Sequence, residues 1–175
     1  MLLLVLCVFN ARGQSPDTTG MNSLIVYGDG FSFSVYEPDG WMGDTDSAAS
    51  YGGSNIIFYP EGAGPGGDAT LIQVSVFEKK DEKTEEDLAY DVAQYAEYAG
   101  LHTEKIALGH PEYQVFSKLV YVKGSFHAYI AYLNGGVRYE SGLSTVMTVV
   151  GREATDAELD AFRQVIASLW LMGLK

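Results

Sequence analysis

The strongest pattern of hydrophobic and polar positions runs from Gln114 to Val150. It predicts three successive strands, over residues 114–122, 125–133 and 137–150, joined by Lys123-Gly124 and by Asn134-Gly135-Gly136. Asn-Gly at a short connection is a strong hairpin signal, because these residues accept the positive φ angles of turns between paired strands. We therefore predict an antiparallel meander.

The first of these strands is apolar on both of its alternating faces, and Lys118 is its only charge. One face carries Val115, Leu119 and Tyr121, and the other carries Phe116, Val120 and Val122. A sheet that is apolar on both faces has to be covered on both faces. The pattern therefore predicts a sheet that lies between two other layers.

Two amphipathic helices are predicted to supply these layers. Thr84-Glu85-Glu86-Asp87 has the pattern of a capping box, and an apolar stripe follows from Leu88 until Gly100 ends the helix. Thr155-Asp156-Ala157-Glu158 repeats the capping pattern before a stripe that runs to Trp170. The last helix is expected to pack on the sheet.

Alternation of apolar and polar residues predicts further strands in the first two thirds of the chain, and a short helix is predicted over Asp44–Tyr51. Trp41 is expected to cover the edge of a core. The predicted strands span 23–27, 31–36, 55–59, 70–78 and 103–109. Together the elements indicate one α+β domain, an α/β/α sandwich with a central, mostly antiparallel sheet.

The N-terminal residues predict export. Leu2–Phe9 is a compact apolar run, and Ala11 and Gly13 have the small side chains of a cleavage site. We expect a secretory signal over residues 1–13, a flexible linker over 14–22 and one domain over 23–173, in a secreted or periplasmic protein. No positive charge precedes Leu2, so a short strand or buried plug is the alternative.

Cys7 is the only cysteine of the 175-residue chain. Lipidation at Cys7 is disfavoured, because the preceding residue, Leu6, is not small. Cleavage near Gly13 would remove the thiol, which would exclude disulfides, cysteine-rich zinc sites and a cysteine nucleophile. The formal net charge of -12 argues against nucleic acid as a partner, since phosphate binding needs clustered Lys and Arg.

Two motifs match catalytic or cofactor signatures only formally. Gly62–Gly67 fits G-x-G-x-x-G, but Pro65 interrupts it and a strand is predicted next, so we interpret it as a flexible loop. His110-Pro111-Glu112 fits the H-x-E of zinc deaminases, but the chain lacks their P-C-x-x-C pair. His102 and His127 have no helical spacing for zinc. No catalytic, cofactor-binding or metal-ligating residue is predicted.

Two weaker hypotheses concern carboxylates and aromatic residues. Asp44 and Asp46 could bind Ca²⁺ through oxygen ligands, although Ala48 stands at the next ligand position of an EF-hand. The chain has twelve tyrosines, and those that are exposed could form a protein-binding face together with Trp41. Scattered surface aromatics are the alternative interpretation.

Four short motifs together cover most of residues 23–172. They are Phe31-Ser32-Phe33-Ser34-Val35, Pro38-Asp39-Gly40-Trp41, Leu71–Phe77 with the helix from Thr84, and Phe162 with Ser168-Leu169. In their sequence and order these motifs resemble the PsbP/Mog-type domains. The resemblance implies an α/β/α sandwich with an antiparallel sheet, found in exported bacterial proteins, in photosystem II subunits and in regulators of a nuclear GTPase. It thereby implies binding modules, and no functional residue is carried over.

The leading hypothesis from the sequence is an exported, non-enzymatic binding or assembly module of the cell envelope with a protein partner. The first alternative is a hydrolase whose site the fold assembles around His110, His127 or Asp44. The second is a small-ligand or Ca²⁺ carrier with the glycine-rich loop as a lid. Each alternative needs side chains from distant segments to meet.

Overall fold

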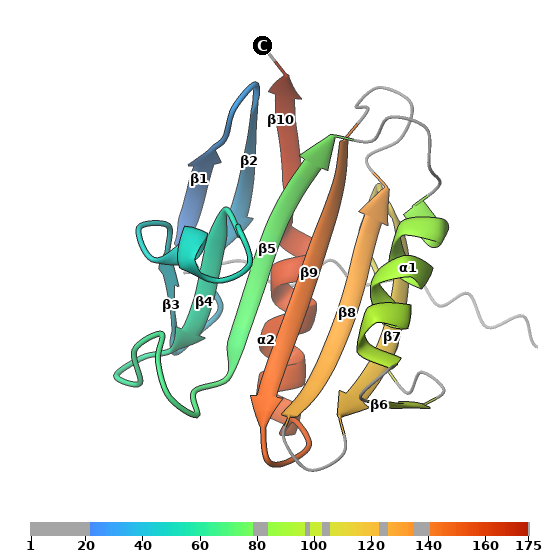
Figure 1. The fold of residues 1–175 in the computed structure, drawn as a ribbon. Coiled ribbons are helices and arrows are strands. Elements are labelled where there is room, and N and C mark those ends of the chain that lie inside the picture. Colours follow the sequence, from blue (N-terminus) through green and yellow to red (C-terminus); the bar gives the residue numbers. More distant parts are fainter. Residues whose placement is uncertain are drawn as a thin grey trace, which may run out of the picture.

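The computed structural model describes residues 22–78, 84–96, 99–102, 106–122, 126–134 and 141–174. These residues form two antiparallel sheets and two α-helices of 13 residues each (Figure 1). The helices are α1 (Thr84–Ala96) and α2 (Asp156–Ser168), and Ala48–Ser50 forms a 3-10 helix, η1. The strands are β1 (Ser23–Tyr27), β2 (Phe31–Tyr36), β3 (Trp41–Asp44), β4 (Ile56–Pro60), β5 (Leu71–Glu78), β6 (Ala99–His102), β7 (Gln114–Val122), β8 (Phe126–Asn134), β9 (Ser141–Val150) and β10 (Trp170–Leu174).

The large sheet has seven strands in the order β3-β4-β5-β9-β8-β7-β6. The predicted meander is confirmed, because β8 pairs antiparallel with both β7 and β9. In register, Ile130 of β8 lies opposite Lys118 and Val146, so the three strands run side by side over most of their length.

The small sheet has three strands in the order β1-β2-β10. β2 is the central strand, and the C-terminal strand β10 pairs with it antiparallel, with Trp170 opposite Ser34. The prediction that the last helix continues to Trp170 is wrong, because α2 ends at Ser168 and Leu169 is extended. The small sheet therefore joins the first strands of the domain to the last strand.

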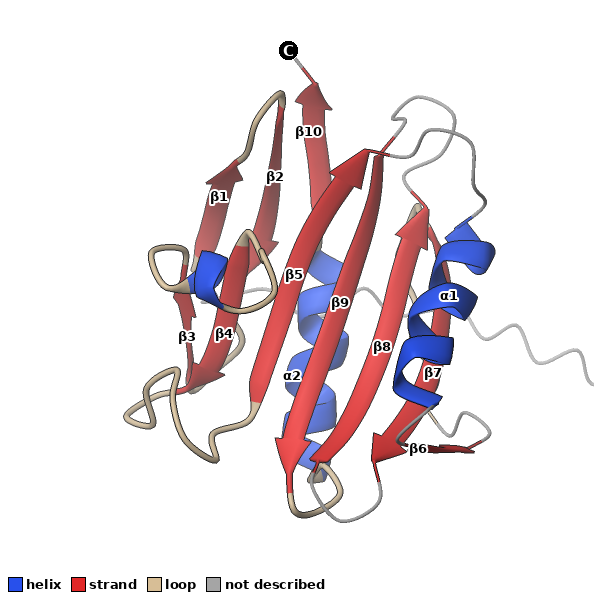
Figure 2. Cartoon of the chain, viewed as in Figure 1, coloured by secondary structure: helices blue, strands red, loops and turns tan. Residues whose placement is uncertain are grey.

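The α/β/α sandwich that the sequence predicts is wrong. Strands make up most of the regular structure, and the described residues add only two short α-helices to the two sheets (Figure 2). One face of the large sheet is covered by α2 together with the small sheet, and α1 on the other face lies over β7, β8 and β6. The physical reason is that β1, β2 and β10 pair with one another and supply apolar cover that we expected from helices.

The main core lies between the large sheet, α2 and the small sheet, and we call this side of the large sheet the inner face. Phe162 and Ile166 of α2, Phe33 of β2 and Met147 of β9 are fully buried there. Gly43 of β3 also belongs to this contact, because a Cβ at Gly43 would lie 2.6 Å from Cδ1 of Leu24. Glycine therefore lets the two sheets approach each other at this edge.

The other side of the large sheet, the outer face, is covered by two separate elements. Leu88 and Val92 of α1 pack on Val120, Ile130 and Tyr132, which form a small cluster of buried residues. Over β4, η1 and its neighbours form a second cluster. The prediction for the first meander strand is confirmed, since its inner and outer apolar residues pack in different clusters. The inner ones are Val115 and Leu119, and the outer ones are Phe116 and Val120.

Several local predictions are wrong. Over Asp44–Tyr51 only the single turn η1 is helical, and the preceding strand β3 was not predicted. The first helix ends at Ala96, and Ala99–His102 form a strand instead of its last turn. Residues 106–109 are not a strand. The predicted signal, Cys7 and all of the predicted linker except Asn22 fall in residues 1–21, outside the described residues. Both meander turns fall largely in residues 123–125 and 135–140, which are also outside them.

Candidate functional site

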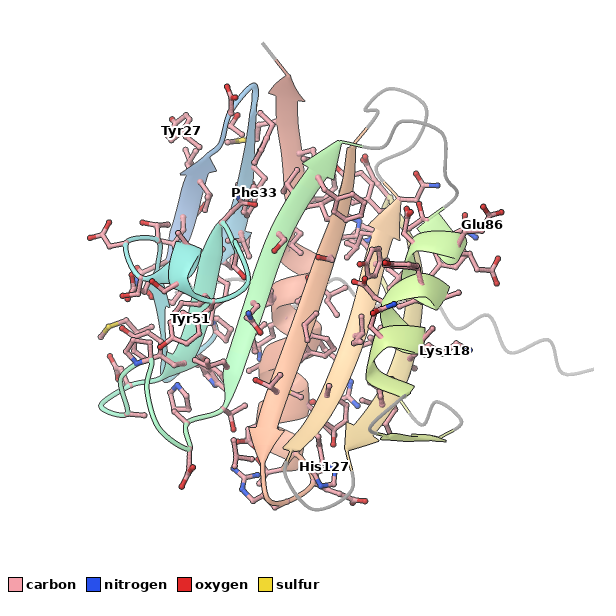
Figure 3. All side chains as sticks on the ribbon, viewed as in Figure 1. Tyr27, Phe33, Tyr51, Glu86, Lys118 and His127 are labelled. Carbon is pink, nitrogen blue, oxygen red and sulfur yellow. The ribbon has the colours of Figure 1, made fainter. Side chains whose placement is uncertain are left out.

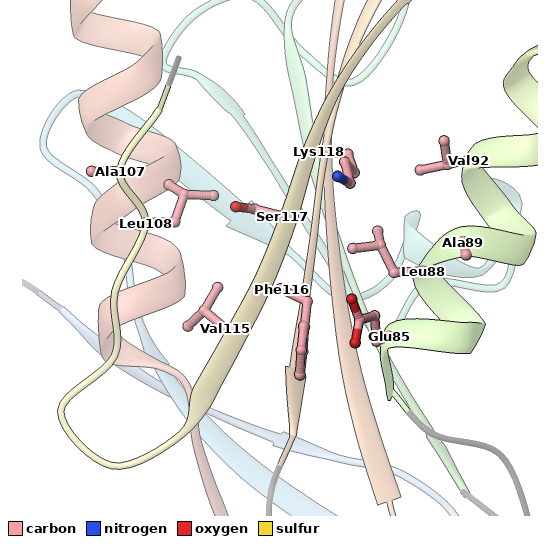
Figure 4. A pocket seen from close by; sticks show the side chains of 10 residues that line it. All are labelled: Glu85, Leu88, Ala89, Val92, Ala107, Leu108, Val115, Phe116, Ser117 and Lys118. Carbon is pink, nitrogen blue, oxygen red and sulfur yellow. The ribbon is translucent and has the colours of Figure 1, made fainter. Parts of the chain in front are cut away.

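A groove with a volume of about 640 Å³ lies beside β7 (Figure 4). Its lining comes from three parts of the chain: α1, the first half of β7, and the segment that precedes β7. Its apolar lining includes Leu88, Leu108, Val115 and Phe116, and charged groups are supplied by Glu85 and Lys118. This combination of apolar surface and a few charged groups is typical of binding sites.

The groove lies along the part of β7 that β6 does not cover within the described residues. β7 has nine residues, but β6 has only four and pairs with Leu119–Val122. The other edge of β7 is fully paired with β8 from Gln114 to Val122. Within the described residues, no strand pairs with the outer edge of residues 114–118. Among the described residues, β7 is therefore paired on both of its edges only from Leu119 to Val122.

The segment 106–109 lies outside the large sheet, and its residues Ala107 and Leu108 line one wall of the groove. Ile106 is buried in the main core, and Leu108 packs against the same core. Figure 4 shows Ala107 and Leu108 on the α2 side of β7, while Leu88 and Val92 of α1 lie on the other side. The edge of β7 therefore lies between two walls that belong to opposite faces of the sheet.

The two charged groups of the groove are separated. Figure 4 shows Lys118 and Glu85 toward opposite ends of the groove, with Leu88 between them. Both side chains are exposed, and neither makes a hydrogen bond or ion pair within the part of the chain that the structure describes. Both charges are therefore available to a bound molecule.

His110 holds the segment before β7 in place. Its Nε2–H donates to the carbonyl oxygen of Leu169 at 2.8 Å, while Nδ1 accepts from the main-chain N–H groups of Glu112 and Tyr113 at 3.1 and 2.9 Å. The ring stacks on Tyr113 and meets Trp170 edge to face, with centroids 4.3 and 4.9 Å away. His110 therefore connects this segment to the junction of α2 and β10.

This arrangement fixes the chemistry of His110. Because two N–H groups point at Nδ1, the proton sits on Nε2 and the ring is neutral. Burial lowers the pKa of the imidazole, and the hydrogen bond to the Leu169 carbonyl only partly offsets it. A base needs an accessible lone pair, and the lone pair of Nδ1 is already occupied. The deaminase-like H-x-E motif is therefore a structural turn.

The structure does not bring together the other residues of the predicted hydrolase site. Asp44 ends β3 at one edge of the large sheet, and His127 lies on β8, opposite Val149 of β9. Three strands, β4, β5 and β9, separate β3 from β8, which corresponds to about 19 Å. Figure 3 shows His127 near one end of the sheet, away from Tyr51 over β4. His102 lies in β6.

The carboxylates of the Ca²⁺ hypothesis lie in the turn after β3. Asp44 accepts a hydrogen bond from the main-chain N–H of Ser47 at 2.9 Å, and this bond lowers its pKa. Asp46 is exposed. The described part of the chain holds no group of three or more His, Cys, Asp or Glu side chains that could share a metal ion.

The glycine-rich loop connects β4 to β5 and opens no helix. Gly62, Gly64 and Gly67 have positive φ angles between 71 and 80°, and the next element is the strand that begins at Leu71. The hydroxyl of Tyr51 donates to the carbonyl oxygen of Pro65. The loop therefore packs beside η1, near the edge of the large sheet that is opposite to the groove. Trp41, considered for a protein-binding face, is buried in the main core.

The most strongly shifted carboxylate is Glu158, and its role is structural. Arg152 donates to both carboxylate oxygens at 2.7 Å, Thr70 donates at 2.5 Å, and the main-chain N–H of Thr155 donates at 2.8 Å. These bonds, led by the pair with Arg152, lower its pKa to about 2 against the effect of burial. The capping box predicted at Thr155 and Glu158 is confirmed.

Comparison with known proteins assigns no family. No protein-family model matches the chain, and no curated protein matches it. A crystal structure of a protein from Bacteroides thetaiotaomicron VPI-5482 is similar at 18% identity and a TM-score of 0.42, over 82% of this chain and 45% of the other. This chain thus spans less than half of that protein. The resemblance to PsbP/Mog-type domains stays a prediction.

No helix in the described residues has the length and apolar character needed to span a membrane.

The sequence analysis did not predict the groove, although one signal for it was present. Lys118 is the only charge in an otherwise apolar strand, and lysine is typical of strands at the edge of a sheet. The second charge, Glu85, was interpreted only as part of a capping pattern.

Proposed function

We propose that this chain is an exported, non-enzymatic binding module, and that the groove beside β7 receives an extended segment of a partner protein. The observation that carries the proposal is the groove of about 640 Å³ along the first half of β7, whose lining combines apolar side chains with the charged groups of Glu85 and Lys118. An extended peptide can lie in such a groove beside a strand, where contacts with its alternate side chains give specificity.

The dimensions of the groove support this occupant. Residues 114–118 span about 16 Å, which matches a five-residue extended segment. Successive side chains of an extended segment beside β7 would point in opposite directions. One set would meet Leu88 and Phe116, and the other would meet Leu108 and Val115. Each set has apolar surface to cover.

Export is supported by the N-terminal sequence. The apolar run Leu2–Phe9, followed by the small residues Ala11 and Gly13, fits a secretory signal. His110 is not offered as a catalytic base in this proposal, because both of its ring nitrogens are engaged in structural hydrogen bonds.

The proposal can be tested with peptides selected on the immobilised domain from a random phage-displayed library. Selected peptides are expected to slow amide hydrogen exchange within 114–118. Ala89→Trp should abolish binding, because Ala89 is an exposed residue that lines the groove and a tryptophan would fill it. Ala93→Trp is the matched control, since Ala93 is exposed on the same helix and does not line the groove. Peptides that bind Ala89→Trp unchanged would contradict the proposal.

A second candidate is a carrier of a small amphiphilic molecule, favoured by the groove volume of about 640 Å³, which lies within the range of small-molecule sites. A thermal-shift screen against a metabolite panel tests it. A ligand present at a hundred times its dissociation constant should add about 2.7 kcal/mol to the free energy of unfolding. Such a ligand would leave the exchange of the β7 edge amides largely unchanged, whereas a peptide would slow it.

A further inference from the structure

We infer that the solvent-facing side of the small sheet binds an uncharged oligosaccharide chain, which lies along β2. No residue of the small sheet lines the groove beside β7, so this site is separate and does not depend on the proposed function. The inference is carried by the side chains that β1, β2 and β10 turn away from the main core. These side chains combine aromatic rings with hydroxyl groups and carry no charge.

Alternation along the strands decides which side chains form this surface. Val26, Phe33 and Leu171 are buried in the main core, so their neighbours in the strands point the other way. Figure 3 shows Tyr27 on the outside of β1, whereas Phe33 lies between β2 and the large sheet. We call the following side chains the solvent face of the small sheet: Ile25, Tyr27, Ser32, Ser34, Tyr36 and Trp170.

The pairing of the strands places two serines at the centre of the solvent face. Ser34 lies opposite Ile25 on one side and opposite Trp170 on the other, and Ser32 lies opposite Tyr27. Neighbouring strands are about 4.8 Å apart, so Ile25 and Trp170 lie about 10 Å apart across the sheet. Because serine is much smaller than these neighbours, a ligand chain can lie over β2 between larger side chains.

The hydroxyl groups of this face are available to a ligand. Within the part of the chain that the structure describes, the hydroxyls of the two serines and of Tyr27 and Tyr36 make no hydrogen bond. A hydroxyl group both donates and accepts, and so do the hydroxyl groups of a sugar. The centre of the face can therefore exchange hydrogen bonds with a sugar in either direction.

Aromatic rings flank the serines. Tyr27 is 77% exposed on β1. On β10 the partly exposed ring of Trp170 is held by His110, which it meets edge to face at 4.9 Å, and by Tyr113 at 5.9 Å. The ring of Trp170 thus has a fixed orientation before a ligand binds. Since the C–H faces of a sugar ring are apolar, they can pack on aromatic rings while the sugar hydroxyls reach polar groups.

The solvent face is uncharged, although the chain has a net charge of -12. Asp, Glu, Lys and Arg make up 19% of the chain, but none of them occurs in β1, β2 or β10. Glu37 follows β2, but its carboxylate accepts from the main-chain N–H of Gly43 at 2.6 Å and from Nδ2 of Asn22 at 3.1 Å. Asp29 lies in the turn that joins β1 to β2. An uncharged face on an acidic chain favours an uncharged ligand, because the chain repels anions.

The layout of the face favours a carbohydrate over a protein or a membrane. A protein interface has apolar side chains at its centre and polar ones at its rim. Here the order is reversed, because Ser32 and Ser34 are central and large side chains lie on the flanking strands. Binding to an anionic membrane needs clustered Lys and Arg, which the three strands lack. Residues 32–36 span about 14 Å, which suits a short oligosaccharide.

The test is a titration of the protein with hexasaccharides, followed by NMR. The uncharged probes are cellohexaose, mannohexaose, xylohexaose and maltohexaose, and hexagalacturonic acid is the charged control. At least one uncharged probe is expected to shift the amide signals of 32–36 and the indole N–H signal of Trp170. Hexagalacturonic acid is expected to leave these signals unchanged, because its carboxylates are repelled by the acidic chain.

Two exposed tyrosines offer a matched pair of variants. Tyr27→Ala should weaken binding of the sugar about tenfold, because it removes a ring of the solvent face. Tyr90→Ala should leave binding unchanged, since Tyr90 is 67% exposed on α1 and not on the small sheet. Ser34→Tyr should abolish binding, because its ring would occupy the centre of the face.

Several outcomes would overturn the inference. One is that no uncharged hexasaccharide shifts the signals of the solvent face at millimolar concentration, and another is that hexagalacturonic acid shifts them equally. Equal loss of binding in Tyr27→Ala and Tyr90→Ala, or sugar-induced shifts confined to the groove beside β7, would place the sugar elsewhere. Shifts on this face with library peptides or phosphatidylcholine vesicles, but with no sugar, would make a protein or a membrane the partner instead.

Discussion

The two faces of the large sheet are covered in different ways. The inner face carries one continuous core that includes α2 and all three strands of the small sheet. The outer face is covered in two places, by α1 over β7 and β8 and by η1 over β4, and β5 and β9 lie between them (Figure 1). The difference indicates that the inner face supplies most of the stability, which leaves the α1 side of the sheet free to form a groove.

The largest effect is expected from Phe162→Ala on the inner face. Phe162 is fully buried in the main core, and its removal leaves a cavity that neighbouring residues cannot fill completely. The free energy of unfolding should fall by about 4 kcal/mol, measured by urea denaturation. If the variant does not fold, Phe162→Leu gives a smaller loss of the same sign. A loss below that of the outer-face variant Leu88→Ala would contradict the comparison.

Leu88→Ala tests the outer face. Leu88 is buried under α1 but also lines the groove, so solvent can reach part of the space that its side chain leaves. We expect a loss of about 2.5 kcal/mol in the same denaturation experiment, at the lower end of the range for buried leucines. Ala93→Gly, at an exposed position of α1, controls for weakened helix propensity and should cost about 1 kcal/mol. Unfolding of α1 alone, seen as faster amide exchange only in 84–96, would sharpen the comparison.

Glu158 makes the stability of the inner layer depend on pH. Its pKa in the folded chain is about 2, below the ordinary 4.5, so its stabilising effect is complete above pH 4.5 and is lost as the pH falls toward 2. Glu158→Gln should lower the free energy of unfolding by about 2 kcal/mol at pH 7. It should also make this free energy depend less on pH below pH 4.5. Denaturation curves between pH 2 and 7 measure both effects. Asp156→Asn, an exposed change in the same helical turn, should leave the loss of stability at low pH unchanged.

The smallest effect is expected from His110. Burial lowers its pKa, so the folded state favours the neutral ring, and stability should fall as the pH drops below the ordinary value of about 6.5. An NMR titration of the imidazole resonances should show the lowered pKa in the folded chain. His110→Gln should remove this pH dependence between pH 5 and 7. A pKa at or above the ordinary value would show that Nδ1 is free, which would revive the catalytic interpretation.

The sequence predicted the parts of the fold that depend on local pattern. The meander strand Gln114–Val122 was predicted with its observed ends, since its alternation is strict and turn residues follow it. β10 was missed because Leu169 and Trp170 continue the helical spacing of α2, although Leu169 is already extended. β6 was missed because Ala99 and Gly100 were interpreted as the end of a helix. Pairing with distant strands decides both cases, and a local pattern does not contain it.

Local sequence patterns could not predict the candidate site either, because it depends on contacts between distant segments. The groove is lined where, among the described residues, β6 pairs only with Leu119–Val122 and where 106–109 packs against the main core outside the sheet. Neither event has a local signature. The histidine and glycine motifs that looked like chemistry have structural roles, as His110 shows through both ring nitrogens.

The pairing of β10 with β2 constrains the way in which the chain is made. Ser34 and Trp170 are neighbours in the small sheet but lie 136 positions apart in the chain. A polypeptide still attached to the ribosome therefore holds β2 without one of its two partners until β10 has been synthesised. Folding of this domain should finish only after β10 has left the ribosome, and its first strands should be the ones that depend on a chaperone in the meantime.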